Sequence, residues 1–253
     1  MIQVENFSKS YDNNRAVDGL SFEVAGSSIL GLVGPNGSGK TTTLRVLAGV
    51  LPPSSGTLRV AGYDVAAAPL EAKRRLAFIP DVPHLFENLT VWEHLEFTAR
   101  VYRLQQAGGW EQAAEELLAE FELHDQRDKM ADQLSLGMSQ KVVMCCALLH
   151  EPDVLLLDEP LTGLDPRGIR TLYRALEQRA SNGASIVLST HLLGQIGDLC
   201  DRFLILKEGR RIAYGSRADI HTSLPSLEGA ASLEEIYFEA TEGGAGTSLE
   251  ETG

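Results

Sequence analysis

The sequence predicts an α/β fold with a mainly parallel sheet, an N-terminal antiparallel β subdomain and an inserted helical subdomain. Short apolar runs alternate with helical patterns along most of the chain, which favours parallel strands joined by helices. Residues 17–24 and 57–65 instead alternate partly with period two and have turn signals nearby, as antiparallel strands do. From residue 88 to about residue 150 the apolar spacing is helical, so we expect this stretch to form the inserted subdomain.

Individual elements can be assigned where the patterns are short and well bounded. In residues 110–121, apolar side chains recur at helical spacing opposite acidic ones. Residues 203–207 and 211–214, separated by Glu208-Gly209-Arg210, are typical of a hairpin. The strands predicted to be buried in the sheet are 28–33, 154–157 and 185–188.

Charge and composition narrow the classes of function. The chain has 253 residues with 22 Lys and Arg against 35 Asp and Glu, a formal net charge of −13. Nucleic-acid binders need a basic face that neutralises phosphates, so this balance disfavours that class. The longest uncharged apolar run, 142–149, is far shorter than a membrane span, and the first residues lack the pattern of a signal peptide. With three cysteines we expect reduced thiols, the default in the cytosol, rather than a disulfide framework.

We expect one globular domain over residues 1–225, with the helical subdomain at about 82–150, and an acidic extension over 226–253. The extension carries seven glutamates and no Lys or Arg, and its end has the low hydrophobicity of a disordered segment. An anionic lipid surface would repel such a segment. Any membrane association is therefore expected to run through a protein partner.

Residues 34–41 match the phosphate-binding pattern G-x-x-x-x-G-K-[ST] directly after a predicted strand. A triphosphate needs many donors at close range, and glycines let backbone N–H groups approach it without a Cβ in the way. The helix expected to follow offers its positive N-terminal end. Lys40 is expected to reach the β- and γ-phosphates and the Thr41 hydroxyl to bind Mg²⁺. The strand before and the helix after favour a P-loop NTPase core over a chance Gly-rich turn.

Two acids end the apolar run 154–157. The carboxyl ends of parallel strands form the edge where open α/β sheets bind ligands, so Asp158 is expected to hold Mg²⁺, usually through water. Glu159 is expected to polarise the attacking water. The alternative, that both acids only cap a buried strand, is disfavoured by the P-loop pattern in the same chain.

His191 follows residues 185–190 in the same way. A single histidine is more often structural. Its expected place on the edge that carries Lys40 and Asp158 favours a contact with the γ-phosphate, or with Glu159 and the attacking water.

With these motifs in this order, residues 2–215 or so resemble the nucleotide-binding subunit of ATP-binding cassette (ABC) transporters. Residues 34–42 resemble its Walker A motif and 155–159 its Walker B motif with the catalytic glutamate. Leu164-Asp165 is similar to the D-loop, His191 to the switch histidine, and Tyr11 to the aromatic residue that stacks on adenine. The resemblance implies that Glu159, His191 and Lys40 are catalytic and that Asp165 belongs to the D-loop. It implies that Mg²⁺ is held by Thr41, Asp158 and Asp81. The residues that it implies for ATP binding are Tyr11, Gly34, Pro35, Asn36, Gly37, Ser38, Gly39, Lys40, Thr41 and Thr42.

Residues 134–138, Leu-Ser-Leu-Gly-Met, resemble the LSGGQ signature that separates this family from other P-loop enzymes. They precede a helix expected over 139–149, at whose amino end Ser135 and the Gly137 N–H suit a γ-phosphate. In the family that phosphate belongs to the other protomer. The resemblance therefore implies a dimer around two ATP in which Ser135, Gly137 and Met138 contact the partner's nucleotide. The alternative is that Ser135 is only a helix cap.

The chain departs from the family pattern at three positions. Leu136 replaces the first glycine of the signature and Met138 replaces its glutamine, while Ser135 and Gly137 are kept. Asp81 stands where the family usually has the glutamine of the Q-loop. Aspartate is shorter and charged, so it reaches Mg²⁺ only through a water. Either hydrolysis is slowed or coupling uses other contacts.

The resemblance implies a subunit that hydrolyses ATP and powers translocation by a separate transmembrane subunit on the cytoplasmic face of the cell membrane. Residues 87–91, the Gly137-Met138 form of the signature and residues 232–238 are similar to single-cassette exporters of multidrug or antibiotic type. Residues 80–95 are expected to transmit the ATPase cycle, and His84, Leu85 and Phe86 in this stretch are either an exposed apolar patch or subdomain core. The alternative function is a soluble ABC-type ATPase that acts as a nucleotide-dependent assembly or regulatory factor. A DNA-maintenance ATPase is disfavoured by the net charge.

Overall fold

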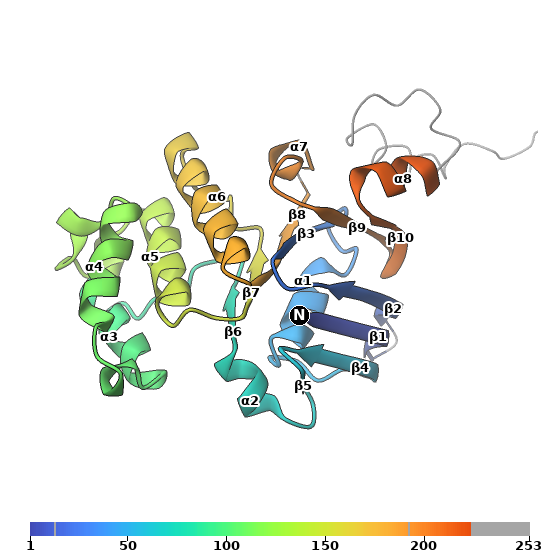
Figure 1. Ribbon diagram of the computed structural model, residues 1–253, viewed down its shortest axis with the longest axis horizontal. Helices are drawn as coiled ribbons and strands as arrows, with labels where there is room; N and C mark the ends of the chain where they lie inside the picture. The colour runs from blue at the N-terminus through green and yellow to red at the C-terminus, as the bar shows by residue number, and fades with distance from the viewer. Residues whose placement is uncertain (13, 192, 224–253) are drawn as a thin grey trace, which may run out of the picture.

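A six-stranded sheet runs through the middle of the computed structural model, which describes residues 1–12, 14–191 and 193–223 (Figure 1). The strand order is β10-β9-β3-β8-β7-β6, and neighbours are parallel except in the β9–β10 hairpin. The predicted α/β class with a mainly parallel sheet is thereby confirmed. The strands are β3 (Ser28–Val33), β6 (Leu76–Ile79), β7 (Val154–Asp158), β8 (Ser185–Thr190), β9 (Arg202–Lys207) and β10 (Arg210–Gly215).

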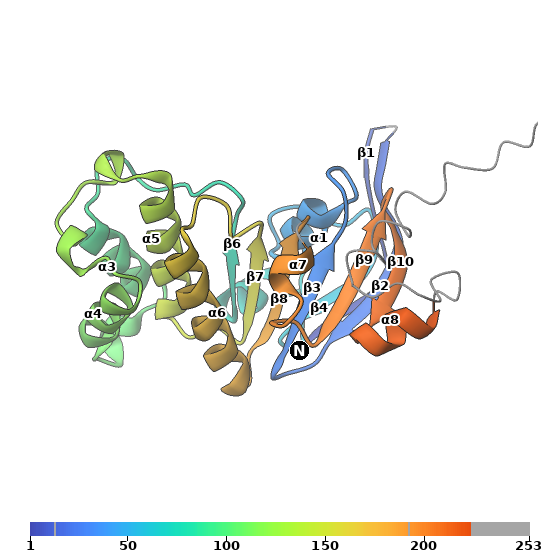
Figure 2. The same ribbon diagram turned by 90° about the horizontal axis from the view of Figure 1, so that it is seen from above.

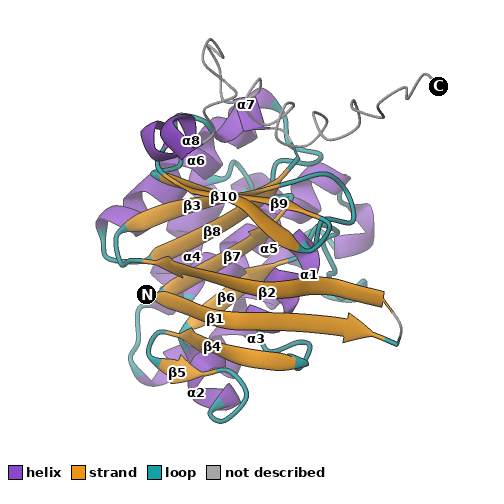
Figure 3. Cartoon of the chain, turned by 90° about the vertical axis from the view of Figure 1, so that its right-hand side faces the viewer, coloured by secondary structure: helices purple, strands orange, loops and turns teal. Residues whose placement is uncertain are grey.

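A second, antiparallel sheet is built largely from the N-terminal part of the chain and lies in front of the parallel sheet in Figure 3. Its order is β2-β1-β4-β5. The pattern of the sequence did not predict β1, because three register shifts interrupt its pairing with β2 and its burial does not alternate regularly. The strands are β1 (Ile2–Tyr11), β2 (Asn14–Val24), β4 (Ser55–Val60) and β5 (Tyr63–Asp64).

Helix α1 (Lys40–Leu47) packs between the two sheets (Figure 2). Its buried side chains Leu44 and Leu47 share one apolar cluster with Phe7 of the antiparallel sheet and Leu156 of the parallel sheet. The helix that follows the phosphate-binding loop is therefore fixed from both sides.

Three helices lie together at the left of Figure 1 and come between β6 and β7 in the chain. Their buried faces share a second apolar cluster with the other face of the parallel sheet. They are α3 (Val91–Val101), α4 (Trp110–Glu120) and α5 (Leu136–Leu149), with 3₁₀ turns at Leu104–Gln106, His124–Gln126 and Ala131–Gln133. The remaining helices are α2 (Pro69–Arg74), α6 (Pro166–Ser181), α7 (Leu193–Ile196) and α8 (Arg217–Ser223).

Helix α5 begins at Leu136, three residues before the start at Ser139 that the sequence predicts. The reason is the Ser135 side chain, whose hydroxyl accepts a bond from the Met138 N–H at 3.3 Å and caps the helix at this point. Gly137 therefore lies in the first turn of α5, where backbone N–H groups have no partner within the helix.

The three cysteines are free thiols on α5 and after α7. Burial raises the pKa of Cys146 to about 11 and raises those of Cys145 and Cys200 as well. Among the described residues, no helix is both long enough and apolar enough to cross a membrane. The acidic extension 226–253 lies outside the described residues.

Candidate functional site

Four neighbouring strands of the parallel sheet carry the predicted site residues at one edge. The phosphate-binding loop follows β3, Asp81 follows β6, Asp158 ends β7, and His191 follows β8. Because β3, β8, β7 and β6 are adjacent and parallel, their carboxyl ends bring these residues together.

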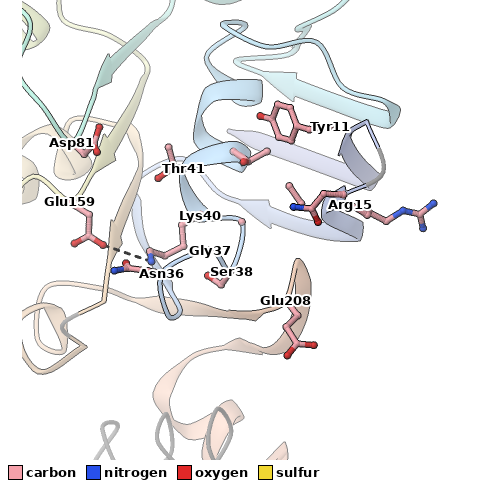
Figure 4. A pocket seen from close by; sticks show the side chains of 14 residues that line it. Tyr11, Arg15, Asn36, Gly37, Ser38, Lys40, Thr41, Asp81, Glu159 and Glu208 are labelled. Atoms are coloured by element: carbon pink, nitrogen blue, oxygen red, sulfur yellow. Dashed lines mark ion pairs between the residues drawn. The ribbon is translucent and has the colours of Figure 1, made fainter.

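A cavity of about 570 Å³ opens at this edge (Figure 4). Most predicted ATP-binding residues line it, and Tyr11, at the end of β1, faces it across the loop. The lining residues are Tyr11, Asn14, Arg15, Ala16, Asn36, Gly37, Ser38, Gly39, Lys40, Thr41, Thr42, Asp81, Glu159 and Glu208. The predicted residues Gly34 and Pro35 lie in the same loop and contact Lys40 instead.

Two glycines of the loop, Gly34 and Gly39, stand where an added side chain would collide with neighbouring atoms. A Cβ added to Gly34 would lie 2.4 Å from both the Leu206 carbonyl oxygen and the Ser38 hydroxyl. Gly39, the residue before α1, has φ +103°, a conformation that favours glycine. The loop is thus shaped to turn its N–H groups and the amino end of α1 toward an anion.

Lys40 is buried, with 5% of its surface exposed. Its Nζ donates to the Gly34 carbonyl at 2.7 Å and the Pro35 carbonyl at 3.3 Å, and lies 3.7 Å from Glu159 Oε1. Burial lowers the pKa of Lys40, while the charges of Glu159 and Asp158 act to raise it. A buried ammonium group of this kind is stabilised by a nearby anion such as a triphosphate.

Asp158 has one carboxylate oxygen available for a cation. Its Oδ1 accepts a bond from the Ser189 hydroxyl at 2.6 Å, while Oδ2 is buried without a hydrogen-bond partner. Burial raises the pKa of Asp158, the Ser189 and Thr41 hydroxyls oppose this, and Asp81 and Glu159 add to the rise. A carboxylate oxygen without a hydrogen-bond partner fits Mg²⁺, which proteins hold through one or two carboxylates together with phosphate oxygens. In the described part of the chain, no three His, Cys, Asp or Glu side chains are grouped so as to hold a metal by themselves.

Glu159 and His191 are in contact. The His191 Nδ1 lies 3.0 Å from Glu159 Oε2. Glu159 has φ +45°, a left-handed conformation that costs a non-glycine residue about 1–3 kcal/mol. Such conformations persist where the surroundings hold them and are common at active sites. A carboxylate held by a histidine in this way has the geometry that a general base requires, and the pair stands beside the phosphate-binding loop.

Asp81 lies at the wall of the cavity with 46% of its side chain exposed. Its Oδ1 is 4.0 Å from Arg45 Nη2 on α1, and its charge is close enough to raise the pKa of Asp158. An exposed pair of this kind contributes about 0–1 kcal/mol, so Asp81 is free to turn toward a cation.

We expect Asp81→Gln to lower the Mg²⁺ concentration needed for half-maximal ATP hydrolysis by about twofold or more. The longer amide can reach the cation directly, where aspartate needs a bridging water. The measurement is ATPase rate against Mg²⁺ at fixed ATP, with Glu87→Gln, an exposed acid outside the cavity, as the control. An unchanged Mg²⁺ titration would place Asp81 outside the metal's ligands.

The signature residues do not line the cavity of their own chain. Ser135 caps α5, and Met138 is partly buried against the apolar cluster of the helices. An added Cβ on Gly137 would lie 2.5 Å from the Gly163 carbonyl oxygen, so the signature packs directly on the segment that leads to Asp165. The Asp165 carboxylate caps α6 by accepting from the Gly168 N–H at 2.8 Å.

Sequence reasoning missed the cavity-lining residues Asn14, Arg15, Ala16 and Glu208. The sequence indicated only a hairpin turn at residues 208–210. In the structure, the Gly209 N–H donates to the Ser38 carbonyl at 3.1 Å, and the Gly209 carbonyl accepts from the Asp18 N–H at 2.9 Å. These bonds join segments far apart in the chain, so no local spacing could have indicated them.

This phosphate-binding loop, with two acids and a histidine on the same sheet edge, defines a P-loop protein built to bind a nucleoside triphosphate. The family described as ABC transporter matches residues 17–162, and this chain belongs to that family as an ATP-binding, ATP-hydrolysing subunit. It is 34% identical over 246 residues to the ABC-type transporter ATP-binding protein EcsA of Bacillus subtilis (strain 168), covering 97% of this chain and 98% of that protein. It is 36% identical to the daunorubicin/doxorubicin resistance ATP-binding protein DrrA of Streptomyces peucetius, over 89% of this chain and 68% of that one. A solved ATP-binding subunit of an ABC transporter superposes with a TM-score of 0.89 at 37% identity, covering 95% of this chain and 99% of that chain.

Proposed function

We propose that two copies of this chain close around two Mg·ATP and that reopening after hydrolysis drives a separate transmembrane subunit of an exporter. One observation carries the proposal. The phosphate-binding loop and the signature each have the residues needed to bind phosphate, yet the signature does not line the cavity of its own chain. A second chain is the natural source of the missing half of each site.

Within one chain, the residues divide the work by position. Lys40 and the loop N–H groups bind the β- and γ-phosphates, while Thr41 and Asp158 would hold Mg²⁺, with Asp81 reaching it through water. Bound Mg²⁺ would neutralise charge on the phosphate oxygens. Glu159 accepts the proton of the attacking water, and His191, 3.0 Å away, keeps that carboxylate oriented.

The γ-phosphate would link the two chains. The Ser135 hydroxyl and the Gly137 N–H stand at the positive amino end of α5, which favours an anion. Loss of the γ-phosphate on hydrolysis removes the group that this end binds, so the dimer reopens.

An exposed apolar surface beside the Q-loop supports a protein partner. Phe86 and Phe97, which we call the Q-loop face, are 57% and 47% exposed. Phe86 and Phe97 form an edge-to-face pair at 5.3 Å, whereas Leu85 packs into the helical cluster and His84 is exposed. Both aromatics line a cavity of about 580 Å³ together with Leu85 and Leu89, which suits an apolar helix of a transmembrane subunit on the cytoplasmic side.

The names of relatives favour export. Besides DrrA, the relatives include Nod factor export ATP-binding protein I of Paraburkholderia xenovorans, 37% identical over 85% of this chain and 70% of that protein. The second candidate function remains a soluble assembly or regulatory ATPase, which would need the same site but no membrane partner.

Glu159→Gln tests the proposal. The variant is expected to bind ATP without turnover and to double its mass by light scattering when Mg·ATP is added, because the base is lost and the phosphates stay.

When the trapped dimer is pulled down from solubilised membranes, it should recover a polytopic membrane protein. Adding Phe86→Ser and Phe97→Ser should keep the dimer and lose that protein. Recovery of soluble partners alone would favour the second function. A variant that stays monomeric at saturating ATP, even with its membrane partner, would overturn the dimer.

A further inference from the structure

Ser189 contacts both acids at the end of β7. Its hydroxyl donates to Asp158 Oδ1 at 2.6 Å and accepts from the Glu159 N–H at 3.2 Å, while its carbonyl accepts from the same N–H at 3.1 Å. The side chain is fully buried, and Ser189 lies opposite Asp158 in the β7–β8 ladder. One serine on β8 is therefore hydrogen-bonded to Asp158, the predicted metal ligand, and to the backbone of Glu159, the predicted base.

These bonds fix how the acids can act. With Oδ1 engaged by Ser189, Asp158 presents Oδ2, the oxygen that has no hydrogen-bond partner. The two acceptors on Ser189 hold the N–H of Glu159 in its left-handed conformation. Two residues further along, His191 holds the Glu159 carboxylate at 3.0 Å. The end of β8 thus fixes Glu159 at its backbone and at its side chain.

We propose that Ser189 is a positioning residue for ATP hydrolysis, which sets the free oxygen of Asp158 toward the cation and holds Glu159 in line with the attacking water. This role rests on the proposed hydrolytic site. It goes beyond the motif residues, since no motif assigned from the sequence includes Ser189.

A purely structural role is the competing explanation, and the same strand supplies a control for it. Ser185 is also fully buried on β8, but its hydroxyl donates to the Ala25 carbonyl at 2.9 Å, at the opposite end of the strand. Loss of the Ser185 hydroxyl removes one hydrogen bond, and loss of the Ser189 hydroxyl removes two, although the Glu159 N–H keeps the Ser189 carbonyl as an acceptor. Of the two, only the Ser189 hydroxyl bonds to the Asp158 carboxylate and to the backbone of Glu159.

The experiment compares Ser189→Ala, Ser189→Thr and Ser185→Ala in the full chain. We expect Ser189→Ala to lower kcat about ten- to hundredfold, because small displacements of a catalytic group have such effects. KM for ATP should stay within about twofold, because the loop that binds the phosphates is unchanged. Ser189→Thr, which keeps the hydroxyl, should recover most of kcat, and Ser185→Ala should keep kcat with a similar loss of Tm.

A second readout does not depend on turnover. In the Glu159→Gln background, the Mg²⁺ concentration for half-maximal binding of a fluorescent ATP analogue should rise about tenfold with Ser189→Ala and not with Ser185→Ala. Equal effects of the two alanine variants on kcat and on Mg²⁺ would overturn the proposal. So would a folded Ser189→Thr variant as slow as Ser189→Ala; if threonine does not fold, the Mg²⁺ comparison of the two alanine variants decides. If Lys40→Ala retains ATP turnover, the proposed hydrolytic site itself is refuted. If Lys40→Ala is inactive and Ser189→Ala has normal kinetics, only the role of Ser189 is refuted.

Discussion

Lys40→Ala will abolish ATP turnover, with a loss of at least about 10²–10³-fold. The Lys40 ammonium is buried, lies 2.7 Å from the Gly34 carbonyl oxygen and is the cation of the cavity nearest to Glu159, at 3.7 Å. Without it, the negative charge that develops on the phosphates in the transition state has no fixed counter-charge from the loop. Phosphate release at saturating Mg·ATP measures the effect.

The matched control for this variant is Lys73→Ala, an exposed lysine on α2 outside the cavity. It should hydrolyse ATP as the unmodified chain does. The fold should tolerate Lys40→Ala, because burial already disfavours the charged side chain. Purified Lys40→Ala protein that still turns over ATP would refute the assignment of the site.

Gly137→Ala will block the ATP-driven dimer while leaving ATP bound to each chain. The added methyl carbon would lie 2.5 Å from the backbone oxygen of Gly163, closer than a carbon and an oxygen can approach, so the segment that leads to Asp165 must move. Since Gly137 does not line the cavity, the affinity of the loop for ATP should hold within about twofold. In the Glu159→Gln background, light scattering should report monomers at saturating Mg·ATP.

Ser139→Ala, two residues along the same helix, serves as the control and should dimerise normally. Turnover of Gly137→Ala should fall about 100-fold, because a displaced signature no longer meets the γ-phosphate. A dimer of ordinary stability in the Gly137→Ala variant would show that the signature does not form the interface.

The class of fold and the phosphate-binding loop could be predicted because their signals are local. Residues 28–33, 154–157 and 185–188 are apolar runs of strand length, and the loop after the first of them has its own spacing of glycines. All three runs fall within strands of the parallel sheet. The alternation in residues 17–24 and 57–65 likewise falls in or beside antiparallel strands.

What could not be predicted depends on contacts between distant segments. β6 has four residues, too few for periodicity to separate a strand from a buried helix turn. β1 is interrupted by register shifts that only its pairing with β2 and β4 defines. Glu208 reaches the cavity because the β9–β10 turn packs on the phosphate-binding loop. Ser189 meets Asp158 only across a ladder of two parallel strands.

The raised pKa values of the three cysteine thiols have a practical consequence for measuring conformational change in this ATPase. Maleimides and mild oxidants react with the ionised thiol, and burial raises the pKa of Cys145, Cys146 and Cys200, which disfavours that form in the folded chain. A reporter cysteine introduced at the exposed Val50, outside the cavity and the signature, would then be the readily labelled sulfur in the native background. Energy transfer between dyes on the two proposed protomers would follow opening and closing without removal of any native cysteine.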